Sequence, residues 1–299
     1  MNNLFSGIIT PIVTPFNDDP EQTINYKATD HLIDHLINNG VNGIFALGSN
    51  GEFTMLSTRE RLAFSKHVIK YVNHRVPVYI GTGACNTNEA IYLAQESEKI
   101  GADALSVITP YFFKLRDKDI YNYYRDIANS VKIPIILYNI PANTQNNISP
   151  EVLDKLAQIP NIMGIKDSSG KLDNINAYLD IVKKHDNLHF LIGSDSKISY
   201  AYTHGASGAI AGTSNLLVKQ VVALNSALRA GDKKMAKKLQ EDLNPLRDVM
   251  HKAPVPVVLK RAVTLANIAN VGDARRPEVA PDDELVKEIN QMLAHYNLI

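Results

Sequence analysis

Two residues whose types could do chemistry, Lys166 and Tyr138, each lie near the end of an apolar segment. Lys166 follows the apolar part of NIMGIKDSSG (residues 161–170), and Tyr138 lies in IPIILYNIP (residues 133–141). A lysine at the end of a buried strand costs free energy unless the amine is paired or has a chemical task. A free amine attacks a ketone to give an iminium, which withdraws electrons from the adjacent carbon. The two residues therefore suggest a Schiff-base site, in which the phenol moves the protons that the reaction needs.

Other roles are open to both side chains. If Lys166 points inward from a strand, Gly164 and Ile162 point inward too by the two-residue alternation, and the glycine leaves room for a small ligand. Lys166 could equally pair with Asp167 or another carboxylate. Tyr138 could be a buried aromatic residue whose hydroxyl satisfies a backbone carbonyl. The local context of the lysine alone does not separate these hypotheses.

A glycine-rich turn, GSNGE (residues 48–52), supplies a third candidate part of the site. Gly48 and Gly51 let backbone N–H groups approach a ligand closely, and Ser49 adds a hydroxyl. Together such groups form a nest that suits a small carboxylate. A glycine-rich turn after a strand is a weak signal by itself, so it is informative only together with the lysine and the tyrosine.

Eight short apolar segments predict the strands that position these residues. Several are continuously apolar rather than alternating, as in parallel strands that are covered on both faces. Most begin about 30 residues apart, which is the length of one strand plus one helix. The predicted strands occupy residues 7–16, 41–48, 76–83, 104–110, 133–139, 162–168, 189–195 and 208–214.

The segments between the predicted strands have the pattern of amphipathic helices. Residues 23–40 carry apolar side chains at helical spacing and end at Gly40, and residues 57–72 begin with Ser57 and Glu60 in a capping-box pattern. From about residue 222 the strands stop, and three helical stretches follow. These stretches span residues 224–251, 254–269 and 281–296.

This order of elements predicts an α/β fold, a TIM (β/α)8 barrel over residues 1–221 with a C-terminal helical domain over residues 222–299. The alternative is a doubly wound open sheet. No G-x-G-x-x-G motif follows the first predicted strand, which weighs against a dinucleotide-binding sheet. In a TIM barrel the active site lies at the carboxyl ends of the strands, where the candidate residues fall.

Composition excludes several classes of function. The chain has 31 basic and 31 acidic residues, and this balance gives no overall attraction to nucleic acid or to anionic membranes. No segment reaches the ~18 apolar residues of a membrane span. One cysteine, Cys85, excludes an internal disulfide, and residues 1–16 lack the basic leader of a signal peptide, so we expect a cytoplasmic protein. No zinc spacing or H-E-x-x-H motif occurs, so no metal site is expected.

Taken together and in this order, the motifs GSNGE, TPY, YNIP, GIKD and GSD resemble those of the dihydrodipicolinate synthase and N-acetylneuraminate lyase superfamily. The resemblance runs from about Phe5 to the C-terminus. It implies a class I aldolase that acts on pyruvate, folded as a (β/α)8 barrel with a C-terminal helical domain. It also implies a homotetramer, a dimer of dimers. The lysine would be the electron sink, so no metal or organic cofactor is expected.

The resemblance also implies roles for individual residues. Lys166 would form the Schiff base, and Tyr138 would be the acid–base phenol. Ser49 and Asn50 would hold the pyruvate carboxylate, and Ile210 would line the pyruvate pocket through its backbone carbonyl. The other motif residues complete the predicted site, with Tyr111 as a further catalytic residue and Gly48, Gly51, Asn143 and Asp195 as substrate-binding residues.

Three positions depart from the patterns of the best-known members. Asn143 stands where the synthase typically has an arginine that clamps the carboxylate of aspartate semialdehyde, and an amide cannot replace this bidentate fork. Phe112 stands where the synthase has a second tyrosine, which enters from a neighbouring subunit. Ser196 stands where sialic acid lyases typically have an acidic residue. The stretches GSDS, AGTSN and TPYFFK look more like the 2-keto-3-deoxy-gluconate aldolase branch.

The sequence thus predicts a lyase that reversibly adds pyruvate to an aldehyde, with a 2-keto-3-deoxy sugar acid as the expected substrate. Dihydrodipicolinate synthase or N-acetylneuraminate lyase activity is the alternative within the same chemistry. The alternative outside it is a non-catalytic keto-acid binding protein on the same scaffold, and the presence of all the proposed catalytic groups argues against it. Expected partners are pyruvate and a small aldehyde or sugar acid, with no nucleic acid and no membrane.

Overall fold

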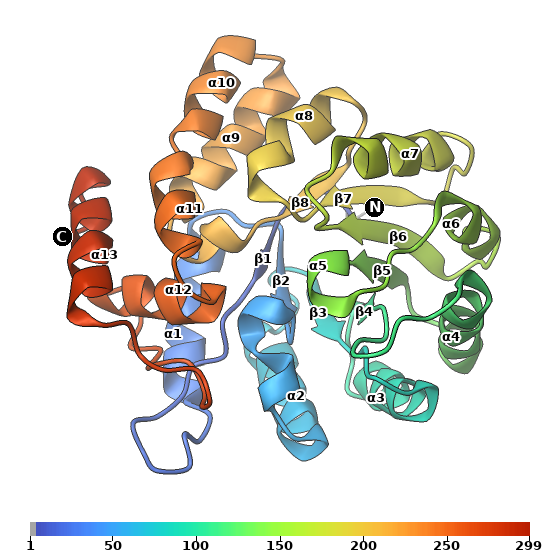
Figure 1. Ribbon diagram of the computed structural model, residues 1–299, viewed down its shortest axis with the longest axis horizontal. Helices are drawn as coiled ribbons and strands as arrows, with labels where there is room; N and C mark the ends of the chain where they lie inside the picture. The colour runs from blue at the N-terminus through green and yellow to red at the C-terminus, as the bar shows by residue number, and fades with distance from the viewer. Residues whose placement is uncertain (1–3) are drawn as a thin grey trace.

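Eight parallel strands close into a barrel in the order in which they follow along the chain (Figure 1). The computed structural model describes residues 4–299. The first three residues of the predicted barrel, 1–3, lie outside the described part of the chain. The predicted TIM barrel is confirmed, and each predicted strand lies where its apolar segment indicated. The strands are β1 Gly7–Pro11, β2 Gly43–Ala46, β3 Val78–Gly81, β4 Ala104–Ile108, β5 Ile135–Asn139, β6 Ile162–Asp167, β7 His189–Ile192 and β8 Gly208–Ile210.

All eight strands are shorter than the apolar segments that predicted them. The first segment, residues 7–16, pairs as a strand only as far as Pro11. Ile12, Val13 and Phe16 follow it and are still buried, because they pack beneath the surrounding elements. A continuous apolar run therefore marks burial and overestimates the length of the hydrogen-bonded ladder.

A small cluster of side chains fills the barrel interior and is separate from the main core between strands and helices. Because alternate residues of each strand point inward, each strand supplies few members of this cluster. Its buried members are Phe5, Ile9, Phe45, Tyr79, Ala104, Ile136, Leu191 and Ile210.

One irregularity in β6 changes which of its side chains face this interior. Ile135 of β5 pairs with Ile162, but the next residue of β5 pairs with Gly164, so Met163 is an extra residue in β6. Met163 packs against the interior cluster, whereas Ile162 lies in the surrounding core. The prediction that Ile162 faces inward with Gly164 and the lysine is therefore wrong, because the extra residue breaks the two-residue alternation.

Helices cover the outside of the barrel and alternate with the strands. The predicted capping box is confirmed, since the Glu60 N–H donates to the Ser57 hydroxyl and the Ser57 N–H donates to the Glu60 carboxylate. The helices of this layer are α1 Tyr26–Asn38, α2 Thr58–Val72, α3 Thr87–Lys99, α4 Asp117–Ser130, α5 Pro141–Thr144, α6 Pro150–Leu156, α7 Leu172–Val182, α8 Ile198–Thr203 and α9 Val218–Ala230.

Four further helices form a C-terminal extension on one side of the barrel, with α13 outermost (Figure 1). The first predicted helical stretch of this region contains the end of α9 and two shorter helices. Helix α9 runs through residue 221 and packs against β1, so the expected domain boundary falls inside a helix of the barrel layer. Among residues 4–299, no helix combines the length and apolarity that a membrane crossing requires. The extension comprises α10 Lys233–Glu241, α11 Asn244–Met250, α12 Val255–Leu265 and α13 Asp283–His295.

Candidate active site

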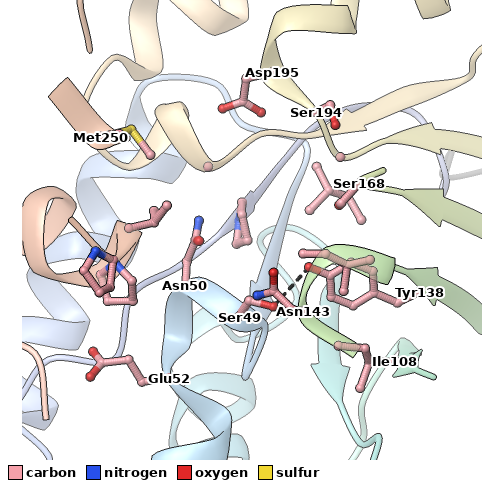
Figure 2. Close-up of a pocket in the computed structure, with 18 of the residues that line it drawn as sticks. Ser49, Asn50, Glu52, Ile108, Tyr138, Asn143, Ser168, Ser194, Asp195 and Met250 are labelled. Carbon is pink, nitrogen blue, oxygen red and sulfur yellow. Dashed lines mark hydrogen bonds between the residues drawn. The ribbon is translucent and has the colours of Figure 1, made fainter. Parts of the chain in front are cut away.

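A cavity of about 790 Å³ opens at the carboxyl ends of the barrel strands, and Figure 2 shows part of its lining. Gly48 and Gly51, which were predicted to bind substrate, are not among the lining residues. They allow close packing of the turn, because a Cβ at Gly48 would lie 2.9 Å from the Phe45 ring and one at Gly51 would lie 3.1 Å from the Ile12 carbonyl oxygen. The other residues predicted for the site all line the cavity. They are Ser49, Asn50, Tyr111, Tyr138, Asn143, Lys166, Asp195 and Ile210.

Lys166 extends from β6 into the mouth of the barrel and is only 4% exposed. Its Nζ lies 3.8 Å from the centroid of the Tyr138 ring and 5.2 Å from that of the Phe45 ring. Tyr138 and Lys166 are direct neighbours in the β5–β6 register. Among residues 4–299, no carboxylate forms an ion pair with this amine. The lysine is therefore held by aromatic faces, which attract a cation without supplying a counter-charge.

Asp167 does not pair with Lys166, although it is the next residue. It is fully buried on the other side of β6 and accepts hydrogen bonds from Asn139 Nδ2 at 2.9 Å, Ser169 Oγ at 2.7 Å and Asn174 Nδ2 at 3.2 Å. Burial raises the pKa of the Asp167 carboxyl, and these hydrogen bonds oppose the rise. Since Asn139 and Asp167 are also paired in register, their contact holds the strand ends that carry the tyrosine and the lysine.

Gly193, which follows β7, makes room for the lysine side chain. A Cβ at this position would lie 2.7 Å from Lys166 Cε and 2.2 Å from Ser168 Oγ. Both Gly193 and Ser168 line the cavity, and neither was predicted from the sequence. The signal that could have found Gly193 is its place in GSDS, at the end of a strand that neighbours the lysine strand.

The hydroxyl of Tyr138 points toward the turn after β2, as Figure 2 shows. The Tyr138 and Ser49 hydroxyl oxygens lie 3.1 Å apart, and either group can donate the hydrogen bond. The ring packs edge-on against Phe45, with centroids 6.5 Å apart. A buried phenol whose ring lies beside the amine and whose hydroxyl is hydrogen-bonded to a second hydroxyl can exchange a proton with a ligand bound to the amine.

The turn after β2 is a short 3-10 helix, η1 Ser49–Gly51, that presents Ser49 and Asn50 to the cavity. The Gly51 N–H donates to the Gly48 carbonyl at 3.0 Å, and the Glu52 N–H donates to the Ser49 carbonyl at 3.1 Å. Asn50 reaches toward Gly212 after β8, where a Cβ would lie 2.7 Å from Asn50 Nδ2. Two polar side chains thus converge on the region above the lysine.

Residues of the extension complete the outer part of the cavity. Helix α11 supplies Arg247 and Met250, and neither was predicted from the sequence, since they lie far from any strand end along the chain. The carboxylate of Asp195, which lines the same cavity, accepts a hydrogen bond from the Thr213 N–H at 2.7 Å. Burial raises the pKa of Asp195, while its hydrogen bonds with Thr213 and the charges of Arg247 and Lys166 act in the other direction.

The TPY motif contributes one residue to the cavity and leaves the next one outside. Tyr111 lines the cavity and packs edge-on against Phe53, with ring centroids 5.9 Å apart. Burial, together with a hydrogen bond to Cys85, raises the pKa of Tyr111 to about 12. Phe112 is 73% exposed and has a left-handed backbone with φ of +83°. No group of three or more His, Cys, Asp and Glu within residues 4–299 is placed to hold a metal ion.

Comparisons with known proteins agree with this geometry. Residues 4–296 match the model of the Dihydrodipicolinate synthetase family. The chain is 32% identical to a 4-hydroxy-tetrahydrodipicolinate synthase of Oceanobacillus iheyensis over 98% of this chain and 97% of that protein. It is 36% identical to the putative 2-dehydro-3-deoxy-D-gluconate aldolase YagE of Escherichia coli K12, over 94% of this chain and 93% of that one. The solved structure of YagE in complex with pyruvate superimposes with a TM-score of 0.94, at 33% identity, over 99% of this chain and all of that chain (100%).

The first prediction from this geometry concerns the phenol. Tyr138→Phe keeps the ring beside Lys166 but removes the hydroxyl that contacts Ser49, so proton transfer should suffer more than binding. We expect kcat for pyruvate release from a cleavable keto acid to fall by about 10² to 10⁴, with a much smaller change in KM. Steady-state kinetics measure both constants. An unchanged kcat would show that the phenol moves no proton in the slow step.

The second prediction concerns the space beside the lysine. Gly193→Ala places a methyl group against Lys166 Cε, and a displacement of the amine by about 1 Å should lower kcat by about a hundredfold. The matched control is Gly164→Ala, two residues before the lysine in β6, where the new methyl would meet nothing closer than 3.4 Å. Thermal unfolding should be similar for both variants. Equal kcat values for the two variants would contradict the role of Gly193.

Proposed function

Because the chain belongs to the dihydrodipicolinate synthetase family, we propose that it is a pyruvate-dependent class I aldolase whose Schiff base forms on Lys166. The resemblance drawn from the motifs is confirmed, and the protein is a carbon–carbon lyase of this family. One observation carries the assignment of the lysine. Lys166 is 4% exposed at the barrel mouth, its Nζ lies 3.8 Å from the Tyr138 ring centroid, and no carboxylate among the described residues forms an ion pair with it.

In the proposed reaction, the free amine of Lys166 attacks the C2 carbonyl of pyruvate. The carbonyl oxygen takes a proton to give a carbinolamine, and loss of water gives the iminium. Removal of a proton from C3 gives an enamine, whose C3 forms the new bond to the aldehyde carbon while the aldehyde oxygen takes a proton. Water then hydrolyses the iminium and frees the lysine, and cleavage follows the same steps in reverse.

The surrounding residues divide the remaining tasks. Tyr138 passes protons to and from the carbinolamine, with Ser49 as the hydrogen-bond partner that orients its hydroxyl. Ser49 and Asn50 bind the pyruvate carboxylate, and Ile210 lines the pyruvate pocket. The iminium itself is the electron sink for C3, so the proposed reaction uses no metal or organic cofactor.

We propose a 2-keto-3-deoxy sugar acid as the substrate that is cleaved. Asn143 lines the cavity where a clamp for a second carboxylate would need an arginine, and Ser196 offers a hydroxyl where an acidic residue would be needed for sialic acid. Two relatives from Escherichia coli K12 carry sugar-acid aldolase names, YagE at 36% identity and the probable 2-dehydro-3-deoxy-D-pentonate aldolase YjhH at 37% identity over 80% of this chain. The 32% identity to the Oceanobacillus synthase keeps synthase activity as the second candidate.

The assembly and the location stay predictions. A homotetramer would bury surface that is apolar in the single chain, and the neighbouring rings of Phe112 and Phe113, 73% and 70% exposed, support an interface with a second copy. A cytoplasmic location is proposed on the single cysteine of the chain.

A panel of keto acids tests the proposed substrate. Pyruvate release should show the highest kcat/KM with 2-keto-3-deoxy-gluconate or the corresponding pentonate, and a far lower value with N-acetylneuraminate. Condensation of pyruvate with aspartate semialdehyde should also be slow, and Asn143→Arg should increase it by restoring a bidentate clamp. A higher kcat/KM with aspartate semialdehyde than with any sugar acid would overturn the substrate choice. Pyruvate binding without turnover of any substrate would instead indicate a keto-acid binding protein.

A further inference from the structure

Glu52, the last residue of the GSNGE segment, is a buried residue of the cavity wall and has no task in the proposed reaction. It is 4% exposed, and its backbone is left-handed, with φ of +53°. Its N–H donates to the Ser49 carbonyl, and its own carbonyl accepts from the Met55 N–H at 2.8 Å. Any shift of Glu52 therefore moves the turn that carries Ser49 and Asn50.

Both carboxylate oxygens of Glu52 are held by the C-terminal extension. Lys260 of α12 donates to Oε1 with its Nζ at 2.9 Å, and the backbone N–H of Arg275 donates to Oε2 at 2.7 Å. Lys260 is fully buried, with 0% exposure, so this contact is an ion pair shielded from solvent. The partners come from more than 200 residues further along the chain, since Lys260 and Glu52 are 208 residues apart.

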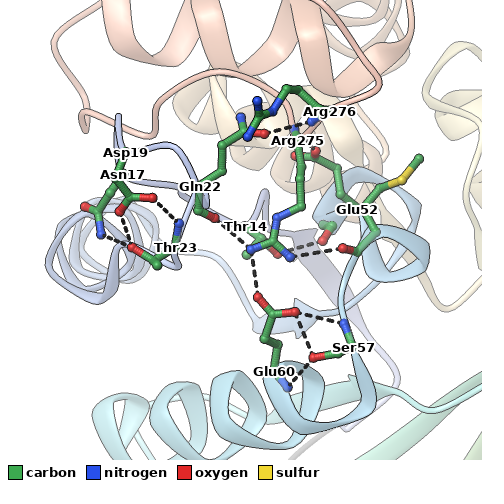
Figure 3. A network of polar contacts seen from close by, with 12 residues as sticks. Thr14, Asn17, Asp19, Gln22, Thr23, Glu52, Ser57, Glu60, Arg275 and Arg276 are labelled. Carbon is green, nitrogen blue, oxygen red and sulfur yellow. Dashed lines mark hydrogen bonds and ion pairs between the residues drawn. The ribbon is translucent and has the colours of Figure 1, made fainter.

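Arg275 also anchors the extension to the barrel part of the chain, and Figure 3 shows its contacts. The Arg275 guanidinium donates to the Gln22 carbonyl at 2.7 Å, to the Met55 carbonyl at 3.0 Å and to Glu60 Oε1 at 2.7 Å. The Phe16 ring lies against both cations, with its centroid 4.0 Å from Lys260 Nζ and 4.4 Å from Arg275 Cζ. Glu52 is thus joined to an anchored segment.

A buried ion pair adds little to stability compared with apolar side chains of similar size, because desolvation offsets the attraction of the charges. Here burial lowers the pKa of Lys260 to about 8, although Glu52 acts in the opposite direction. Stability alone therefore does not account for a lysine and a glutamate at this place. The chain of contacts offers a reason for the pair, because it runs from the extension through Glu52 to the backbone of Ser49.

We propose that Lys260 and Glu52 are a positioning pair through which the C-terminal extension holds the Ser49–Asn50 turn in the geometry that binds the pyruvate carboxylate. The inference rests on the proposed function, since it assigns the carboxylate to this turn. Neither Lys260 nor Glu52 touches the reacting atoms, so loss of the pair should weaken pyruvate binding and slow the chemical step only through the Ser49–Tyr138 hydrogen bond.

Two variants separate positioning from folding. Lys260→Met leaves the Glu52 charge buried without its partner, so it should unfold at a lower temperature and bind pyruvate more weakly. The double variant Glu52→Gln with Lys260→Met removes both charges, so thermal stability should return to near that of the wild type. Pyruvate affinity in the double variant should still be at least about tenfold weaker, since the turn is no longer held, while kcat at saturating substrate should fall less than in Tyr138→Phe, because the phenol is kept.

Lys252→Met is the matched control. It removes a lysine of the extension whose ion-pair partner, Glu288, lies in α13, and this pair does not contact the turn. Pyruvate affinity by titration calorimetry should be unchanged in this variant. Amide hydrogen exchange at residues 48–52, a measure that does not depend on activity, should be faster in the double variant and unchanged in Lys252→Met.

The outcomes distinguish this inference from the proposed function. Absence of pyruvate binding by the wild-type protein would overturn the proposed function and the inference with it. Normal binding by the wild type, with pyruvate affinity and turn exchange in the double variant equal to wild type, would overturn only the positioning pair. Affinity that recovers together with thermal stability would likewise show that the pair is merely structural.

Discussion

Burial of the Lys166 amine without a carboxylate partner is the constraint on which the rest of the site depends. A buried ammonium is costly, and the acidic residue that follows it in the chain, Asp167, is turned to the other face of β6 and accepts hydrogen bonds from neutral donors. The amine is left with the faces of Tyr138 and Phe45, which are 3.8 and 5.2 Å away by ring centroid. The space that Gly193 leaves and the hydroxyl of Tyr138 can serve a reaction at this amine only because no carboxylate is ion-paired with it.

The chain contains a second buried lysine, and the contrast between the two explains their different uses. Lys260 is paired with Glu52 at 2.9 Å, and its charge serves to join the extension to the turn after β2. Lys166 has aromatic neighbours in place of a counter-ion, so its amine is available to a ligand in the cavity. In the proposed function the two lysines act at opposite ends of bound pyruvate. Lys260 acts through the turn that binds the carboxylate, and Lys166 bonds to the carbonyl carbon.

Much of the site could be predicted from the sequence because parallel strands bring their carboxyl ends to one edge. The positions of Lys166 and Tyr138 at neighbouring strand ends were sufficient to bring them together, as the register confirms. The extra residue Met163 could not be predicted, since hydrophobic periodicity does not reveal an insertion within an apolar run. The contributions of Arg247 and Lys260 depend on how the extension docks against the barrel, which is set by tertiary packing rather than by local pattern.

Trapping with pyruvate and borohydride shows directly whether Lys166 forms the Schiff base. Reduction converts an iminium into a stable secondary amine, and mass spectrometry of the digested protein locates it. We expect one pyruvate-derived adduct, on the peptide that contains Lys166, and no adduct in Lys166→Ala. No adduct on the wild-type protein, or an adduct on Lys260, would contradict this role of Lys166.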